Sequence, residues 1–127
     1  MFVRDCMSAH PVSITSSETL ATAAALMRSG HFRRLPVVDD DVLVGIVSEY
    51  DLRDWKDCIE RTAVAEAMTR EVVTVAASDS LEHAVTLTRI HQIGALPVVD
   101  HGHLVGIITA KDLWIAEPRP LPEWDRS

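Results

Sequence analysis

Two short phrases place a hydroxyl three residues before an aspartate at the start of a predicted helix. They are Ser48 with Asp51 and Thr109 with Asp112, and each follows an apolar run. In a capping box the hydroxyl accepts from a first-turn N–H and the carboxylate reaches back to the backbone, with no ligand involved. The same groups could instead hold a phosphate at the helix start and a ribose diol one turn further on. The residues alone leave both interpretations open.

The glycine inside each apolar run, Gly45 and Gly106, also has two interpretations. A glycine within a strand often marks a bulge or the close approach of another backbone. If the neighbouring aspartate binds a nucleotide, the glycine would instead leave room for the base. Both interpretations are kept.

Both phrases belong to a repeat that covers most of the chain. The 61-residue offset between Asp51 and Asp112 aligns LPVVD at 35–39 with LPVVD at 96–100 without a gap. The same offset places Gly45 on Gly106 and Met7 on Met68. A repeat of this length indicates two copies of one structural unit.

Each copy predicts the same order of elements. A helical lead-in (3–7 and 64–68) precedes a brief strand (12–14 and 73–75). A helix follows, capped by Thr19 or Ser80 and running to about Gly30 or His91. Two apolar runs then form a hairpin. A last helix follows, and in the first copy it is expected to continue through residues 53–59.

A unit of about 60 residues buries little apolar surface by itself. We therefore predict a mixed α/β (α+β) fold in which two β-α-β-β-α repeats pair through a pseudo-two-fold axis into one globule. Repeat 1 takes residues 1–60 and repeat 2 takes residues 61–117. Residues 118–127, rich in proline, are expected to form a C-terminal tail.

The composition indicates a globular protein that binds neither nucleic acid nor membrane. The formal net charge of −7 opposes contact with nucleic acid phosphates. The longest nearly apolar stretch, 20–27, is too short to span a bilayer, and the charged N-terminal residues do not suit a signal peptide. Cys6 and Cys58 lie outside any CxxC pattern and are expected to be reduced thiols. We expect a cytoplasmic protein.

The phrase L-P-V-V-D, a polar turn and L-V-G-I-[VI]-[ST]-x-x-D-L, present twice after a strand and a helix, resembles the CBS domain. Two tandem copies resemble a CBS pair, or Bateman module, over residues 3–113. The resemblance implies two clefts, which in many family members bind adenosine-containing ligands such as AMP, ATP or S-adenosylmethionine. It implies no obligatory cofactor. Together with the tryptophans Trp55 and Trp114 near the ends of the repeats, it leads us to expect a homodimer.

By this resemblance, Asp51 and Asp112 would hold the ribose, and Ser48 and Thr109 would lie beside the phosphate. The base would meet the residues that end the first strand of each repeat. These residues are Ile14 and Thr15 in the first copy, and Val75 and Ala76 in the second.

The two copies differ just before L-P, where the first has Arg33 and Arg34 and the second has Gly94 and Ala95. Basic residues at this position often face the phosphates in the family, so Arg33 and Arg34 are candidate phosphate ligands. A pair of solvated arginines is the alternative. Arg34 could serve the cleft of its own repeat or that of the other.

Other candidate chemistry is sparse. His101 and His103 share a predicted hairpin turn, but no further Cys or acidic residue of the second repeat is spaced to complete a metal site. The sequence contains no nucleophile–base pair and no glycine-rich phosphate loop, so we do not expect an enzyme.

The predicted function is a stand-alone regulatory module. It would bind AMP, ADP, ATP or S-adenosylmethionine in clefts between the repeats and relay occupancy to an unidentified partner protein. The alternative is a ligand-free structural or protein-interaction module in which the capping boxes only cap.

Overall fold

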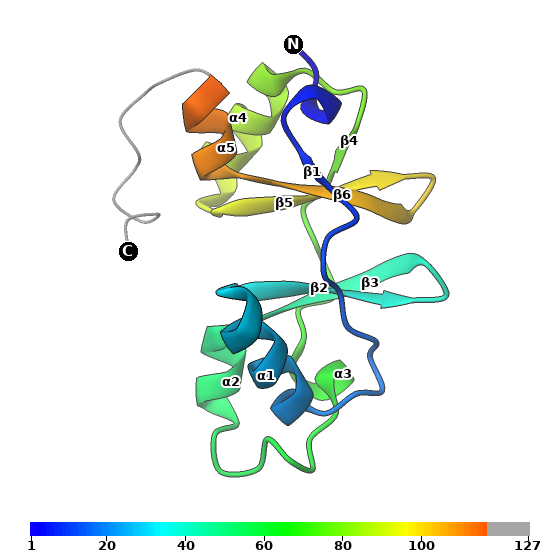
Figure 1. The fold of residues 1–127 in the computed structure, drawn as a ribbon, viewed down its shortest axis with the longest axis vertical. Coiled ribbons are helices and arrows are strands. Elements are labelled where there is room, and N and C mark those ends of the chain that lie inside the picture. Colours follow the sequence, from blue (N-terminus) through cyan, green and yellow to red (C-terminus); the bar gives the residue numbers. More distant parts are fainter. Residues whose placement is uncertain (117–127) are drawn as a thin grey trace. The chain divides into compact units, whose positions relative to one another are not determined.

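The computed structural model describes residues 1–116, which divide into two compact units (Figure 1). The internal unit is Val12–Val72, and the terminal unit combines Met1–Pro11 with the residues from Val73 onward. Both units contain helices and strands, so the predicted mixed α/β class is confirmed. The predicted tail of residues 118–127 lies outside the described residues.

The internal unit contains a hairpin and three helices. In chain order they are α1 (Leu20–Gly30), β2 (Arg34–Asp39), β3 (Val42–Ser48), α2 (Glu49–Asp54) and α3 (Val64–Ala67). The strand predicted over residues 12–14 is reduced to one parallel bridge between Ile14 and Val37.

The terminal unit repeats this order around an N-terminal lead-in. Its elements are the 3-10 helix η1 (Val3–Asp5), β1 (Ser8–Ala9), β4 (Val75–Ala76), α4 (Leu81–His91), β5 (Ala95–Asp100), β6 (His103–Thr109) and α5 (Ala110–Ala116). Here the first strand of the repeat is formed, because β4 pairs in parallel with β5. None of the helices in residues 1–116 is long and apolar enough to cross a membrane.

The predicted helix starts are confirmed. The Thr19 side chain accepts from the Thr22 N–H at 3.3 Å, and the Ser80 side chain accepts from the His83 N–H at 3.1 Å. Each cap satisfies one of the N–H groups that have no partner inside the helix.

The predicted continuation of the last helix of the first copy through residues 53–59 is wrong, because α2 ends at Asp54. The chain turns there so that the Ile59 carbonyl accepts from the Ala21 N–H at 2.9 Å, at the start of α1. A continuing helix would direct that carbonyl along its own axis. The return to α1 therefore overrides the helical pattern of these residues.

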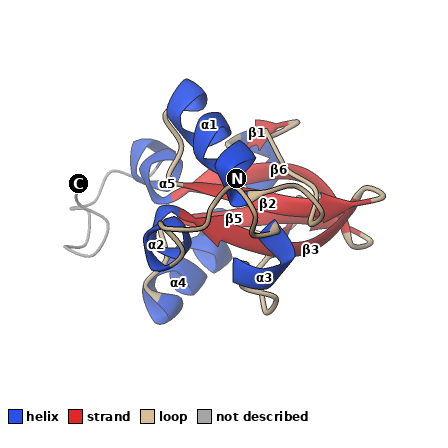
Figure 2. Cartoon of the chain, turned by 90° about the horizontal axis from the view of Figure 1, so that it is seen from below, coloured by secondary structure: helices blue, strands red, loops and turns tan. Residues whose placement is uncertain are grey.

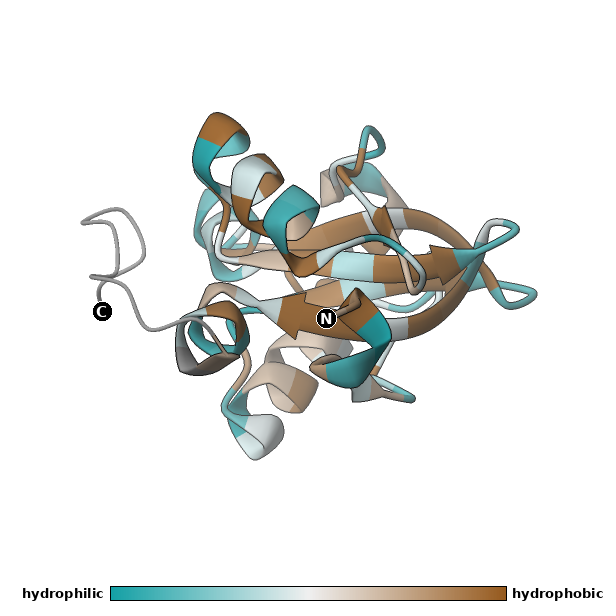
Figure 3. Ribbon diagram, turned by 90° about the horizontal axis from the view of Figure 1, so that it is seen from above, coloured by the Kyte–Doolittle hydropathy of each residue, from teal (hydrophilic) through white to brown (hydrophobic). Residues whose placement is uncertain are grey.

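The two predicted hairpins are confirmed, as β2 with β3 and β5 with β6. Short loops join their strands in Figure 2, and in Figure 3 the strands are largely hydrophobic and the turns hydrophilic. The turn residues Asp40 and Asp41 have φ of 51° and 66°, and His101 and Gly102 have φ of 51° and 83°. Two successive positive φ values match the right-handed twist of the flanking strands.

The lead-in segments complete the two cores. Val3 is fully buried in the core of the terminal unit, and Val64 is fully buried in the core of the internal unit. Their backbones dock in the same way, since Val3 N–H donates to the Asp79 carbonyl at 2.8 Å and Val64 N–H donates to the Glu18 carbonyl at 2.7 Å. Each repeat thus has its core completed by a lead-in that belongs, by the 61-residue offset, to the other copy.

The repeat boundaries at residues 1–60 and 61–117 stay a prediction. The compact units divide the chain elsewhere, because the internal unit begins at Val12 and ends at Val72. The pairing of the repeats through a pseudo-two-fold axis stays a prediction.

Another backbone crosses closely over each strand glycine. A Cβ on Gly106 would lie 2.6 Å from the Met7 sulfur and 3.0 Å from the Ser8 carbonyl oxygen. A Cβ on Gly45 would lie 2.7 Å from the Met68 sulfur and 2.9 Å from the backbone oxygen of residue 69. The close-approach interpretation of these glycines is confirmed. The suggestion that they leave room for a base is wrong, because a methionine and a backbone fill that space.

We therefore expect Gly106→Ala to lower the free energy of unfolding by about 1–3 kcal/mol, the usual cost of overpacking. The added methyl should also loosen the lead-in, so the Val3 amide hydrogen should exchange faster with solvent. Gly102→Ala is the control for the Val3 exchange, because a Cβ there meets nothing within 4 Å and any loss of stability comes from its φ of +83° alone. A Gly106→Ala variant with parental stability and parental Val3 exchange would contradict the close approach.

Candidate ligand-binding sites

The predicted site residues of each repeat lie within one compact unit. The internal unit holds Ile14, Thr15, Arg33, Arg34, Ser48 and Asp51, and the terminal unit holds Val75, Ala76, Thr109 and Asp112. We call Thr15, Arg34, Ser48 and Asp51 the internal site, and their counterparts Ala76, Ala95, Thr109 and Asp112 the terminal site.

The hairpins bring part of each site together. Arg34 lies opposite Ser48 in the β2–β3 register, and Ala95 lies opposite Thr109 in the β5–β6 register. Ile14 hydrogen-bonds further along the same strand, at Pro36 and Val38. The step from residue 34 to residue 36 is roughly 7 Å along a strand. No hydrogen bond within residues 1–116 joins Thr15 to Ser48 or Asp51.

Both hydroxyl–aspartate pairs form capping boxes. The Asp51 Oδ2 accepts from the Ser48 N–H at 2.8 Å, and the Asp51 N–H donates to the Ser48 Oγ at 3.4 Å. The Asp112 Oδ2 accepts from the Thr109 N–H at 2.9 Å, and the Asp112 N–H donates to the Thr109 Oγ1 at 3.1 Å. The capping interpretation is therefore confirmed.

The capping boxes use only one oxygen of each carboxylate. Among residues 1–116, neither Asp51 Oδ1 nor Asp112 Oδ1 accepts a hydrogen bond. An ionised carboxylate can accept about four hydrogen bonds, so each aspartate keeps acceptor capacity for a ligand. Capping and ligand binding are compatible uses of the same side chain.

The two hydroxyls differ in where their hydrogen is directed. Ser48 Oγ donates to Asp51 Oδ2 at 3.1 Å, whereas Thr109 Oγ1 makes no such donation to Asp112. Ser48 would have to turn its hydrogen toward a phosphate, while Thr109 could donate without losing a bond. The helices that follow, α2 and α5, are short, so their dipoles add little to anion binding.

Arg33 and Arg34 lie beside the start of α2. The Arg33 carbonyl accepts from the Glu49 N–H at 2.9 Å, which ties the arginine pair to the first turn of that helix. Arg33 is exposed and Arg34 is half-buried. In the terminal unit the same contact runs from the Ala110 N–H to the Gly94 carbonyl at 2.8 Å, and Gly94 and Ala95 stand in place of the two arginines.

The residues expected to meet the base are only partly available. The Ile14 and Val75 side chains are buried in their cores, 4% and 2% exposed. The Ile14 N–H and carbonyl both bond to β2, through Pro36 and Val38. Contact with a ligand is therefore left to the residues that follow, Thr15 and Ala76.

A carboxylate that the sequence interpretation missed holds the turn after Ile14. Asp39 Oδ1 accepts from the Ser16 N–H at 3.0 Å, and Asp39 Oδ2 accepts from the Ser16 Oγ at 2.5 Å. In the terminal unit this pair is absent, because Ala77 stands in place of Ser16. The sequence carries one signal for this contact. Ser16 in the first copy aligns with Ala77 in the second, whereas the aspartate that ends L-P-V-V-D is present in both copies.

The histidines of the second hairpin turn are engaged locally. His101 Nδ1 lies 2.8 Å from Asp100 Oδ1, and both side chains are largely exposed. Within residues 1–116 no three His, Cys, Asp or Glu side chains gather as a metal-binding group.

Comparison with known proteins identifies the family. A family model described as the CBS domain matches residues 3–57 and 64–113. The chain is a CBS-domain protein. The two matches follow the two copies of the repeat, so the resemblance inferred from the repeated phrase is confirmed.

The CBS-domain relatives include proteins of similar length. YhcV of Bacillus subtilis is 35% identical over 87% of this chain and 81% of its own length. The CBS domain pair of protein MJ0100, solved in complex with 5′-methylthioadenosine and S-adenosyl-L-methionine, is 28% identical over 91% of this chain and 94% of that chain, with a TM-score of 0.82. CBSX2 in complex with AMP is 31% identical over the same shares, with a TM-score of 0.81.

Two matching relatives are longer enzymes. Homoserine O-acetyltransferase of Methanocorpusculum labreanum is 38% identical over 92% of this chain but only 24% of its own length. Inosine-5′-monophosphate dehydrogenase of Mycobacterium leprae is 40% identical over 94% of this chain and 23% of its own length. This CBS-domain chain thus spans about a quarter of these enzymes.

The Ser16–Asp39 contact predicts a pH-dependent contribution to stability. The hydrogen bonds from the Ser16 side chain and backbone hold the pKa of Asp39 below its ordinary value of 3.8. A carboxylate whose pKa falls on folding stabilises the protein above its unfolded pKa, and that stabilisation is lost as pH falls through the folded pKa.

We expect Asp39→Asn to lower the unfolding temperature at pH 7 and the difference from the parent to shrink as the pH falls below about 4. The measurement is thermal unfolding between pH 7 and pH 3. Asp100→Asn is the matched control at the same place in the other repeat, where the carboxylate's one side-chain partner within residues 1–116 is the exposed His101. Equal, pH-independent losses for both variants would contradict this role of Asp39.

Proposed function

We propose that this chain is a regulatory CBS-pair module that binds an adenosine-containing ligand and relays its occupancy to a partner protein. The observation that carries the proposal is the hydroxyl–aspartate pair present in both units, with one carboxylate oxygen that accepts no hydrogen bond from residues 1–116. Solved relatives with AMP, or with methylthioadenosine and S-adenosylmethionine, support the ligand class. Under this proposal the chain is not an enzyme and is located in the cytoplasm.

The ribose is the group that best suits the aspartates. A vicinal diol offers two hydroxyl donors close together, and a carboxylate accepts such bonds with about 1.5–3 kcal/mol each. Asp51 and Asp112 keep Oδ1 available while Oδ2 is fixed by the capping box, so the carboxylate is held in place before the ligand arrives. A fixed acceptor loses little conformational freedom on binding.

The phosphate end distinguishes the two sites. Arg34 stands opposite Ser48 in the hairpin, and Ala95 stands at the matching place opposite Thr109. A guanidinium can bind a phosphate with two parallel hydrogen bonds. We therefore assign Arg33 and Arg34 to phosphate binding and expect ligands with more phosphate to prefer the site that these residues serve.

The ligand-free interaction module is the second candidate, and one observation favours it. Both capping boxes are complete without a ligand. In that case the aspartates would serve the helix starts alone.

A thermal-shift panel with AMP, ADP, ATP, S-adenosylmethionine, NAD and guanine nucleotides separates the candidates, because a ligand at about a hundred times its Kd stabilises by about 2.7 kcal/mol. No shift with any adenosine compound would favour the interaction module.

Arg34→Ala should weaken ATP binding more than adenosine binding, by up to about a hundredfold for ATP, because only ATP offers phosphates to the guanidinium. Calorimetry with ATP, AMP and adenosine measures this. Asp51→Ala and Asp112→Ala should each silence one class of site and cost about 1 kcal/mol of stability through the lost cap. Unchanged nucleotide affinities in Arg34→Ala, or parental binding in both aspartate variants, would refute the site assignment.

We also propose that the chain is a homodimer. Exposed apolar side chains support it, since Trp114 on α5 is 42% exposed and Ile90 on α4 is 67% exposed. Buried tryptophans contribute strongly to interfaces.

Light scattering at high micromolar concentration should give twice the monomer mass, and Trp114→Ala should shift the mass toward the monomer. Phe32→Ala, a change at another exposed aromatic, is the control, and a monomer mass for the parent would rule the dimer out.

A further inference from the structure

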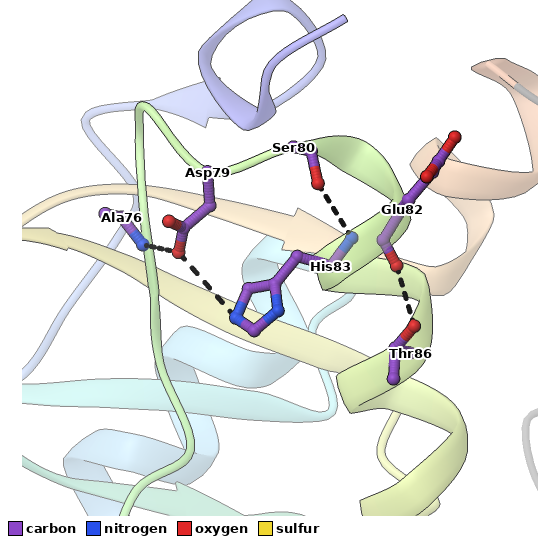
Figure 4. A network of polar contacts seen from close by, with 6 residues as sticks. All are labelled: Ala76, Asp79, Ser80, Glu82, His83 and Thr86. Carbon is purple, nitrogen blue, oxygen red and sulfur yellow. Dashed lines mark hydrogen bonds and ion pairs between the residues drawn. The ribbon is translucent and has the colours of Figure 1, made fainter.

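The two sites differ at the backbone N–H that follows the first strand of each repeat. In the terminal site the Ala76 N–H donates to the Asp79 Oδ2 at 2.9 Å, and the same oxygen lies 3.9 Å from His83 Nε2 (Figure 4). In the internal site the corresponding N–H belongs to Thr15, and it has no hydrogen-bond partner among residues 1–116. One amide is occupied by the chain itself, and the other is available.

The backbone of the two turns is the same, so the difference comes from side chains. The Glu18 N–H donates to the Thr15 carbonyl at 3.3 Å, and the Asp79 N–H donates to the Ala76 carbonyl at 3.0 Å. Glu18 stands where the second repeat has Asp79 and is one methylene longer. The Glu18 carboxylate is exposed and makes no hydrogen bond in the described part of the chain.

The internal turn is held by a different carboxylate, that of Asp39. Asp39 binds the N–H and hydroxyl of Ser16, and the Ser16 carbonyl accepts from the Ala65 N–H at 3.0 Å. These contacts order the turn without using the Thr15 N–H. The terminal turn lacks the serine hydroxyl, and Asp79 closes it through the amide of Ala76 instead.

Adenine presents ring nitrogens that accept hydrogen bonds, so a free backbone N–H is a suitable donor to the base. A donor already bonded to a carboxylate must first release it, and the freed carboxylate would then face an acceptor nitrogen. Losing a hydrogen bond to a charged group corresponds to roughly a tenfold to hundredfold change in affinity.

We infer that Asp79 is a specificity-determining residue that closes the terminal site to the adenine base, whereas the internal site stays open at Thr15. The inference rests on the proposed function, because it supposes an adenosine-containing ligand. His83 supports the closed state only weakly, since its side chain is 52% exposed and exposed ion pairs contribute little.

The test is titration calorimetry with AMP on the parent and on Asp79→Glu, which gives the terminal turn the residue of the internal one. The parent should show one tight site that Asp51→Ala removes. Asp79→Glu should tighten the weaker site at least about tenfold, and Asp112→Ala in that background should remove the gain. Asp79→Ala is the second variant and should also tighten the weaker site. Glu18→Ala is the matched control, because it removes an exposed carboxylate that makes no hydrogen bond in the turn, and it should keep the parental affinity.

A measurement without ligand separates the two proposals. In the parent, the Ala76 amide hydrogen should exchange slowly and the Thr15 amide hydrogen quickly, and Asp79→Glu should speed exchange at Ala76. A parent that shows this exchange pattern but binds no adenosine compound overturns the proposed function and the role of Asp79 in selecting its ligand. A parent that binds AMP, with Asp79→Glu and Asp79→Ala leaving the weaker site unchanged, overturns only the inference.

Discussion

The close passage of each lead-in backbone over a strand glycine is the contact on which both units depend. Met7 and Ser8 cross Gly106, and Met68 with the residue after it crosses Gly45, at distances that leave no room for a Cβ. The crossing places a valine of each lead-in in the core beneath. It also directs the lead-in N–H groups to the carbonyls of the turn after the first strand. A glycine in the strand is thus the condition for both the core and the turn.

This dependence connects stability with the candidate sites. The turns that end at Glu18 and Asp79 each accept a backbone hydrogen bond from the lead-in and are also held by a side-chain carboxylate. A ligand at Thr15 or Ala76 would contact the same turn that the lead-in contacts. Under the proposed function, ligand binding and lead-in docking would therefore share a structural element.

Local patterns allowed much of the fold to be predicted from sequence. Helix starts at Thr19 and Ser80, both hairpins and both capping boxes depend on residues within a few positions of one another, and all are confirmed. The end of α2 at Asp54 depends on a distant partner, the start of α1, and the local pattern gave the wrong answer. The exchange of lead-ins between the repeats could not be predicted from the sequence either, because each lead-in supplies a valine that would suit either core.

The site residues divide in the same way. The capping role of Asp51 and Asp112 follows from their position three residues after a hydroxyl, a spacing that the first helical turn imposes. The contacts of Asp39 and Asp79 depend on side-chain length and on which neighbour supplies a donor. A serine in place of alanine, and a glutamate in place of aspartate, change which amide is bonded while the backbone stays alike. The first copy also has two arginines where the second has a glycine and an alanine. Under the proposed function this difference would favour phosphate binding at the internal site. Under the proposed function, the base contact and the arginines would therefore favour the internal site, and the terminal site would keep the ribose and hydroxyl contacts that the two copies share. A module with one tight and one weak site would respond to its ligand over a wider concentration range than two equal sites would allow.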